Sequence, residues 1–244
     1  LILILAIIFL SGFCFASVID DDLKQAFELF KNGKIDQAYS LYQKVLQNDP
    51  RNFNANFACG IISQTKGQNS QALAFFYKCS EINPRYAPTF NNIGWILFTE
   101  KKLDEAQQNY LKALELDPNY VLAYNNLGIV FIQKNEYRLA TVFFEKAQSI
   151  DPSDFYSYNN LGLVSEQFNR ISEAEKLYIE ALKRSPDNPA VIINLCRIYT
   201  KQGYWSKAVK EMHRLYEKRP DSPAVSFSLA SLYFEMGDRS KCTL

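Results

Sequence analysis

Hydrophobic residues in the middle of the chain recur at the spacing of α-helices. A first stripe, with the spacing i, i+3, i+4, i+7, consists of Phe90, Ile93, Gly94 and Leu97. A second stripe consists of Ala106, Tyr110 and Ala113. Pro118 ends the second stripe, because proline has no backbone N–H to donate inside a helix. The pattern predicts two antiparallel helices, and the small residues Gly94 and Ala106 allow them to approach closely.

The same two stripes return every 34 residues along the chain. The strictest positions are Pro50, Pro84, Pro118, Pro152, Pro186 and Pro220, together with Ala38, Ala72, Ala106, Ala140, Ala174 and Ala208. The register gives repeats at 19–52, 53–86, 87–120, 121–154, 155–188 and 189–222, and a partial repeat at 223–244. One helix pair cannot bury its apolar face alone, so neighbouring pairs are expected to stack.

A left-handed turn residue is expected between the two helices of each repeat. This position holds Gly33, Gly67, Gly203 and Gly237, which adopt that conformation at no steric cost. Asn135 and Asn169 also tolerate it, whereas Lys101 has a Cβ that disfavours it. We therefore expect turns near residues 33, 67, 101, 135, 169, 203 and 237.

From about Ile19 to the end, these residues resemble the tetratricopeptide repeat (TPR) family. The repeats at 87–120 and 121–154 fill every signature position of that family, while Ser165, Asn56, Ser63 and Cys196 depart from it elsewhere. The resemblance implies an all-α, right-handed solenoid of stacked antiparallel helix pairs that serves as a binding scaffold.

Both ends of the chain carry expectations of their own. Residues 1–16 form an uncharged apolar run that resembles a secretory signal peptide; an uncleaved membrane anchor and a lipid-anchored Cys14 are the alternatives. Each of them places the rest of the chain outside the cytoplasm. The partial repeat at 223–244 stops within its second helix, so we expect the sequence to be truncated and Leu229 and Tyr233 to be more exposed than Leu127 and Phe131.

The composition favours an interaction protein over an enzyme. Lys and Arg number 27 against 26 Asp and Glu, and the net charge of +1 lacks the basic excess of a nucleic-acid binder. The chain contains His213 as its single histidine and no CxxC, GxSxG, Walker, HExxH or GxGxxG motif. We therefore predict no catalytic residues, no metal site and no cofactor.

Four cysteines fall on small or apolar positions of the repeat, and they are Cys59, Cys79, Cys196 and Cys242. Buried thiols that act as small hydrophobes are the main expectation, and a disulfide between Cys59 and Cys79 is the alternative.

The resemblance implies that positions 2, 5, 6, 9, 12 and 13 of each first helix line a concave face. Positions 5 and 6 supply the asparagines Asn91, Asn92, Asn125, Asn126, Asn159, Asn160 and Asn194. Positions 9 and 12 supply Trp95, Ile129 and Leu163, together with Phe98, Ile132, Glu166, Arg197 and Thr200. Side-chain amides can hydrogen-bond the backbone of an extended peptide without reading its side chains. The alternatives are that the amides satisfy nearby backbone and that neighbouring repeats cover the apolar residues.

Acidic chaperone C-termini are not expected as partners. TPR domains that bind them carry Lys and Arg on successive first helices, and the matching positions here are Asp20, Asn54, Pro88, Leu122 and Tyr156, or Leu23, Phe57 and Asn91. Lys24 alone cannot make such a clamp.

Three functions fit these observations. The first is an exported or membrane-tethered adaptor that holds a segment of a partner protein in its groove. The second is the substrate-recruiting region of a longer enzyme such as a glycosyltransferase, since O-linked N-acetylglucosamine transferases carry a similar asparagine ladder. The third is an assembly factor for envelope or pilus machinery.

Overall fold

The computed structural model describes residues 18–237, and all regular structure within this range is α-helical. Two compact units, residues 1–123 and 124–244, divide the chain within α8 (Val121–Gln133). The first unit contains α2 (Val18–Lys31), α3 (Ile35–Asn48), α4 (Phe53–Thr65), α5 (Asn69–Ile82), α6 (Ala87–Thr99) and α7 (Leu103–Leu116). The second contains α9 (Tyr137–Ile150), α10 (Phe155–Gln167), α11 (Ile171–Arg184), α12 (Pro189–Lys201), α13 (Trp205–Lys218) and α14 (Pro223–Glu235).

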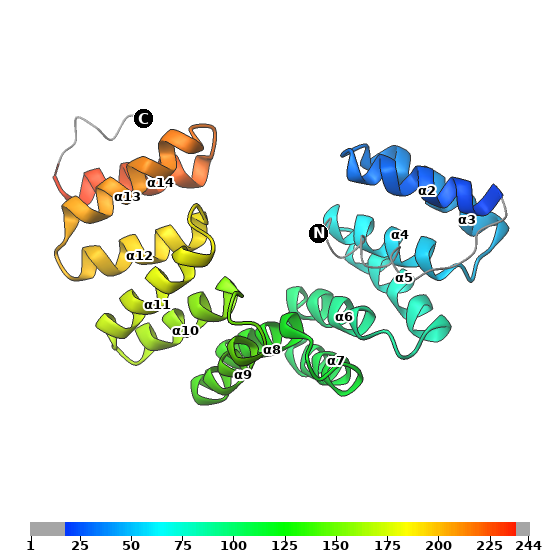
Figure 1. Ribbon diagram of the computed structural model, residues 1–244, viewed down its shortest axis with the longest axis horizontal. Coiled ribbons are helices and arrows are strands. Elements are labelled where there is room, and N and C mark those ends of the chain that lie inside the picture. The colour runs from blue at the N-terminus through cyan, green and yellow to red at the C-terminus, as the bar shows by residue number, and fades with distance from the viewer. Residues whose placement is uncertain (1–17, 238–244) are drawn as a thin grey trace. The chain divides into compact units, whose positions relative to one another are not determined.

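Helices that follow one another in the sequence pack side by side within each unit (Figure 1). In the first unit the pairs are α2 with α3, α4 with α5, and α6 with α7. In the second unit α10 pairs with α11 and α12 with α13. Successive pairs contact each other through α3 and α4, α5 and α6, and α11 and α12. The predicted all-α stack of sequential helix pairs is confirmed.

The turns within the pairs lie where the sequence places them. Positive φ angles occur at Gly33, Gly67, Lys101, Asn135, Asn169, Gly203 and Gly237. Two backbone hydrogen bonds close each of the first six turns; in the first, Gly33 N–H donates to Phe30 O at 3.0 Å and Lys34 N–H to Leu29 O at 2.9 Å. This is the Schellman arrangement, which satisfies the last carbonyls of the first helix. Lys101 adopts the same conformation, with φ of 65°, despite its Cβ.

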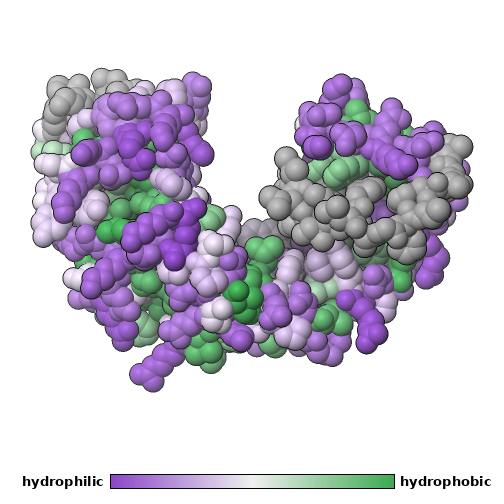
Figure 2. Space-filling view, viewed as in Figure 1, coloured by the Kyte–Doolittle hydropathy of each residue, from purple (hydrophilic) through white to green (hydrophobic). Residues whose placement is uncertain are grey.

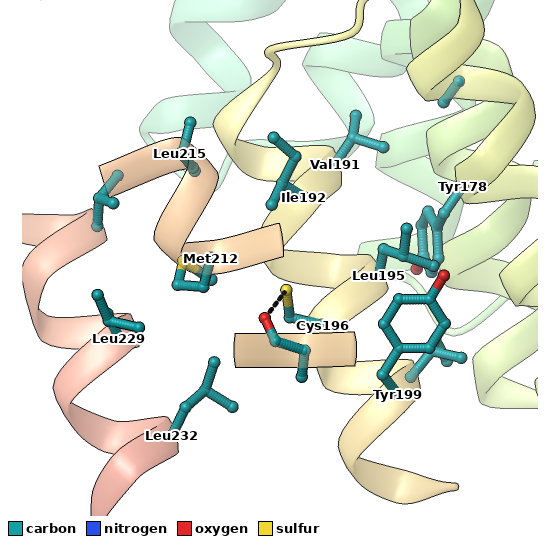
Figure 3. Close-up of a cluster of buried hydrophobic side chains, with 14 of the residues drawn as sticks. Tyr178, Val191, Ile192, Leu195, Cys196, Tyr199, Met212, Leu215, Leu229 and Leu232 are labelled. Atoms are coloured by element: carbon teal, nitrogen blue, oxygen red, sulfur yellow. Dashed lines mark hydrogen bonds between the residues drawn. The ribbon is translucent and has the colours of Figure 1, made fainter. Parts of the chain in front are cut away.

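The signature glycines mark the closest approach of the two helices in a pair. A Cβ added to Gly94 would lie 2.8 Å from the Tyr110 ring, and one added to Gly128 would lie 2.4 Å from the Phe144 ring. Where Cys196 replaces the glycine, the residue sixteen positions later is Met212, a flexible side chain in place of a ring. Figure 3 shows Cys196 and Met212 in one buried cluster, where the Cys196 thiol donates to Ala208 O at 3.3 Å. Small residues therefore set the helix spacing, as the sequence predicts.

The expectation that Leu229 and Tyr233 are more exposed than Leu127 and Phe131 is wrong. Leu229 and Tyr233 are 0% and 7% exposed, the same values as Leu127 and Phe131. The reason is that α14 packs against α13, where Leu229 joins the buried cluster that contains Met212 (Figure 3). The predicted signal or anchor at residues 1–16, with Cys14, lies outside the described residues.

Three of the four cysteines can be placed, and Cys242 lies outside the described range. Cys59, Cys79 and Cys196 are buried free thiols, so the main expectation holds and the disulfide alternative does not. Burial raises the pKa of each of these thiols to about 12, which keeps them protonated and unreactive.

Candidate functional site

Two first helices of the second unit, α10 and α12, begin at polar capping residues. Asp154 caps α10 by accepting hydrogen bonds from the N–H groups of Tyr156 and Ser157. Asn188 caps α12 by accepting from Val191 N–H. These side chains satisfy backbone donors that a helix start leaves unpaired. The fifth and sixth residues of α10 are then Asn159 and Asn160, one turn into the helix.

The asparagines of the second unit bond to other side chains. Asn194 Nδ2 on α12 donates to Asn159 Oδ1 on α10 at 2.9 Å. Asn159 Nδ2 donates in turn to Asn160 Oδ1 at 3.3 Å. Asn125 Nδ2 donates to the Asp154 carboxylate at 2.7 Å, which ties α8 to the cap of α10. Asparagines from the successive first helices α10 and α12 therefore meet, and we call Asn159, Asn160 and Asn194 the amide row.

The amides differ in their access to solvent. Asn160 and Asn125 are buried, whereas Asn126, Asn159 and Asn194 are half-buried. The carbonyl Oδ1 of Asn125 has no hydrogen-bond partner among the described residues. In the first unit, Asn91 and Asn92 are both buried.

One other asparagine, Asn56, donates hydrogen bonds to backbone carbonyl groups. This is the alternative role that the sequence allows for the asparagines of the first helices. Asn56 Nδ2 donates to Asn52 O at 2.8 Å and to Pro50 O at 3.1 Å. Asn56 occupies a position that is normally apolar, one residue before the predicted set. The bonds of Asn125, Asn159 and Asn194 end on side chains instead, so these two groups of amides have different surroundings.

The predicted apolar residues reach the surface to different extents. Trp95 is 39% exposed and its ring lies 5.9 Å from that of Phe98. Ile129 and Leu163 are half-buried, and Leu163 packs against the hydrophobic cluster of the second unit. Figure 2 shows hydrophobic patches among mostly hydrophilic residues on the visible face. Neighbouring helices thus cover Leu163 in part, while Trp95 stays available for contact.

A charged cluster occupies the first helices of the second unit, and we call it the Glu166 cluster. Glu166 Oε1 accepts from Tyr178 Oη at 2.6 Å and from Arg197 Nη2 at 2.6 Å. Its Oε2 accepts from Lys201 Nζ at 2.9 Å and from Arg197 Nε at 3.2 Å. The Glu166 side chain is 6% exposed, against 45% for Arg197 and 46% for Lys201.

The electrostatics of this cluster follow from its contacts. Burial by itself would raise the pKa of Glu166, but the hydrogen bonds from Arg197, Tyr178 and Lys201 outweigh it and hold this pKa below its usual range. Burial, together with the Glu166 carboxylate, raises the pKa of Tyr178. At neutral pH the cluster therefore contains one buried anion and two half-exposed cations.

The sequence alone does not predict this cluster. The register places Glu166 and Arg197 among the concave-face residues without showing that they meet, and Tyr178 is not among those residues. The 34-residue register contains the missing signal, since Lys201 and Glu166 lie 35 residues apart and meet across adjacent first helices.

Between residues 18 and 237 no group of His, Cys, Asp or Glu side chains is arranged to hold a metal ion. None of the helices in that range has the length and the apolar character that crossing a membrane requires.

Family models identify the repeat. A TPR repeat model matches residues 94–135, and tetratricopeptide repeat models match residues 121–154 and 167–215. The chain is a tetratricopeptide-repeat protein. A comparison with curated proteins finds no match.

Solved structures share the TPR fold. The structure of PilF from Pseudomonas aeruginosa is 21% identical with a TM-score of 0.71, over 89% of this chain and 97% of that one. PilW, described as a widely conserved type IV pilus biogenesis factor, is 21% identical with a TM-score of 0.75, over 89% of this chain and 99% of PilW. MamA is 24% identical with a TM-score of 0.59, over 71% of this chain and 97% of MamA. At these identities the likeness shows the fold alone.

Proposed function

We propose that this TPR protein is a non-catalytic scaffold that holds an extended segment of a partner protein along the first helices of its pairs. The amide row carries this proposal, because Asn194 and Asn159 join side chain to side chain across adjacent first helices. A primary amide has two donors and an acceptor with two lone pairs, so each of these bonds uses only part of its capacity. The remaining capacity suits the alternating N–H and C=O groups of an extended backbone.

An exposed aromatic side chain on a first helix of the first unit supports the same proposal. Trp95 on α6 is an aromatic side chain that stays 39% exposed, and large aromatic residues are enriched where protein partners bind. Amides that bind backbone and an apolar residue that binds side chains would together hold a segment without demanding one sequence. The partner is then a protein or peptide rather than a nucleic acid, in agreement with the net charge of +1.

We further propose that the scaffold works outside the cytoplasm, exported or tethered by its N-terminus, as an assembly factor of the cell envelope. Two observations support this role. Residues 1–16 have the composition of a signal peptide or anchor. The fold matches almost the whole of PilW, which is described as a pilus biogenesis factor.

Site-specific photo-crosslinking in cells tests the docking face. A photo-reactive amino acid is placed at Trp95 or Ile129 on first helices, and at Leu111 or Val142 on second helices as matched controls. Leu111 and Val142 are 44% and 57% exposed, so the controls are at least as accessible to a passing protein. We expect one crosslinked partner from the first-helix positions, absent from the controls. Equal crosslinking from both sets would contradict the proposal.

A further inference from the structure

A small hollow lies between α12 and α14 in the second unit, beside the Glu166 cluster. Its volume is about 240 Å³. Ile193, Cys196, Met212 and Leu232 line it with apolar surface, and Cys196 and Met212 are buried. Arg197 and Glu235 stand at its exposed rim. Small-molecule sites usually measure roughly 300–1,000 Å³, so this hollow fits a single side chain better than a cofactor.

The rim of this hollow carries an excess of positive charge. Arg197 and Lys201 share one carboxylate, that of Glu166, so the Glu166 cluster has a net charge of +1. Nearly half of each cationic side chain is exposed, whereas Glu166 is buried beneath them. A second anion can therefore approach both cations from solvent without displacing Glu166. Glu235, which also lines the hollow, disfavours a ligand that carries several carboxylates.

The hollow continues the amide row. Asn194 and Arg197 are three residues apart on α12, so they lie on the same face of that helix. Asn159 and Glu166 are seven residues apart on α10, again on one face. An extended segment held by the amide row would therefore pass directly beside Arg197 and the opening of the hollow.

We propose that the hollow is a specificity site for an acidic residue of the partner segment, with an apolar residue next to it. Arg197 and Lys201 bind the Asp or Glu carboxylate, and the neighbouring apolar side chain enters the hollow between α12 and α14. This inference rests on the proposed function, because the amide row must first hold the segment. The carboxylate belongs to a side chain within the segment and not to its C-terminus, because a segment bound along the amide row continues past the hollow.

Selection from a phage library of random twelve-residue peptides tests this site. The native chain is compared with Arg197→Gln, which removes one cation, and with Glu166→Gln, which removes the competing anion. Lys183→Gln is the matched control, because Lys183 is an exposed cation on α11 that pairs with Glu180 and does not line the hollow. Thermal melting confirms that each variant is folded before selection.

We expect the native chain and Lys183→Gln to enrich peptides in which Asp or Glu stands beside an apolar residue. Arg197→Gln should bind a selected acidic peptide about tenfold more weakly, since a charge-assisted contact is lost. Glu166→Gln should bind it more tightly, because both cations then face the ligand alone.

Two results would overturn the inference, and they are distinguishable. Enriched peptides without acidic residues, or an acidic preference that survives in Arg197→Gln, would remove the specificity site and leave the docking face standing. No enrichment over the starting library would remove the docking face and the specificity site together.

Discussion

Lys101 stands where the other turns of this chain have glycine or asparagine. Its φ is 65°, and the left-handed conformation costs an ordinary residue roughly 1–2 kcal/mol. We predict that Lys101→Gly raises the free energy of unfolding by about 0.5–1 kcal/mol, because the relief of strain exceeds the added entropy of the unfolded chain. Urea unfolding followed by circular dichroism measures the change.

Gly67 provides the control in the opposite direction. Its φ is 73° and a Cβ there would meet nothing within 4 Å, so Gly67→Ala tests backbone strain without a steric clash. We expect it to lower the free energy of unfolding by about 1 kcal/mol. If Lys101→Gly also lowers it, the Lys101 side chain stabilises the turn in a way that the backbone geometry does not show.

Glu166 should make stability depend on pH in the acid range. Its pKa is lower in the folded chain than the value of about 4.3 expected when unfolded, so the folded state gains stability from the carboxylate above that pH. This gain is lost as the pH falls through the folded pKa. The stability difference between the native chain and Glu166→Gln should therefore be largest at pH 7 and shrink below about pH 4. A difference that stays constant between these pH values would contradict this account.

Individual residues were predictable where one local rule decides them. The turn positions followed from glycine and asparagine at a fixed place in the repeat, and all of them have positive φ. The Glu166 cluster was not predicted, because it depends on side-chain geometry across three helices. Tyr178 comes from α11, and its hydroxyl could have pointed elsewhere, as the buried hydroxyl of Tyr110 does without any partner among the described residues.

At the scale of a helix pair, the packing of glycine against a ring sets the spacing. A Cβ on Gly128 would lie 2.4 Å from the Phe144 ring, so Gly128→Ala must push the two helices apart or distort the ring. We predict that it lowers the free energy of unfolding by about 1–3 kcal/mol, the usual effect of overpacking a core. Chemical denaturation measures it.

The pair formed by Cys196 and Met212 suggests how to rescue this variant. Adding Phe144→Met to Gly128→Ala copies the combination of a larger first-helix residue with a flexible partner that the chain itself uses. In a double-mutant cycle the combined change should cost less than the sum of the single changes. Simple additivity would show that Gly128 and Phe144 do not set the spacing together.

The helices themselves were predictable from periodicity, since apolar stripes and prolines fix where each begins and ends. The exposure of α14 was not predicted correctly. The register identifies which residues of α14 face a neighbour, but it does not show that the cluster formed with α12 and α13 buries Leu229 completely. Burial depends on three-dimensional packing that sequence spacing describes only in part.

At the scale of the whole chain, the family and the stacked pairs followed from the 34-residue repeat, and the amides of the first helices followed from its register. Their bonding did not follow, because an asparagine side chain can reach backbone, a neighbouring side chain or a ligand with equal ease. Asn56 bonds to backbone and Asn194 to Asn159, although both lie early in first helices. The position of each asparagine on its helix therefore decides whether its amide binds backbone or another side chain.

The central claim is that the amides of the first helices bind the backbone of a partner segment. Asn126→Ala combined with Asn160→Ala removes amides from two successive first helices of the second unit. Each lost hydrogen bond is worth roughly 0.5–1.5 kcal/mol, so the double variant should bind the crosslinked partner segment about 5- to 150-fold more weakly. Asn56→Ala is the matched control, which should melt at a lower temperature and keep its affinity, because that amide satisfies backbone.

Calorimetric titration of the double variant with the partner segment, beside its thermal melt, is the most direct measurement. The account predicts weakened binding with a melting temperature close to that of the native chain. Unchanged affinity with a lowered melting temperature would contradict it, and would show that these amides serve the fold in the way that Asn56 does.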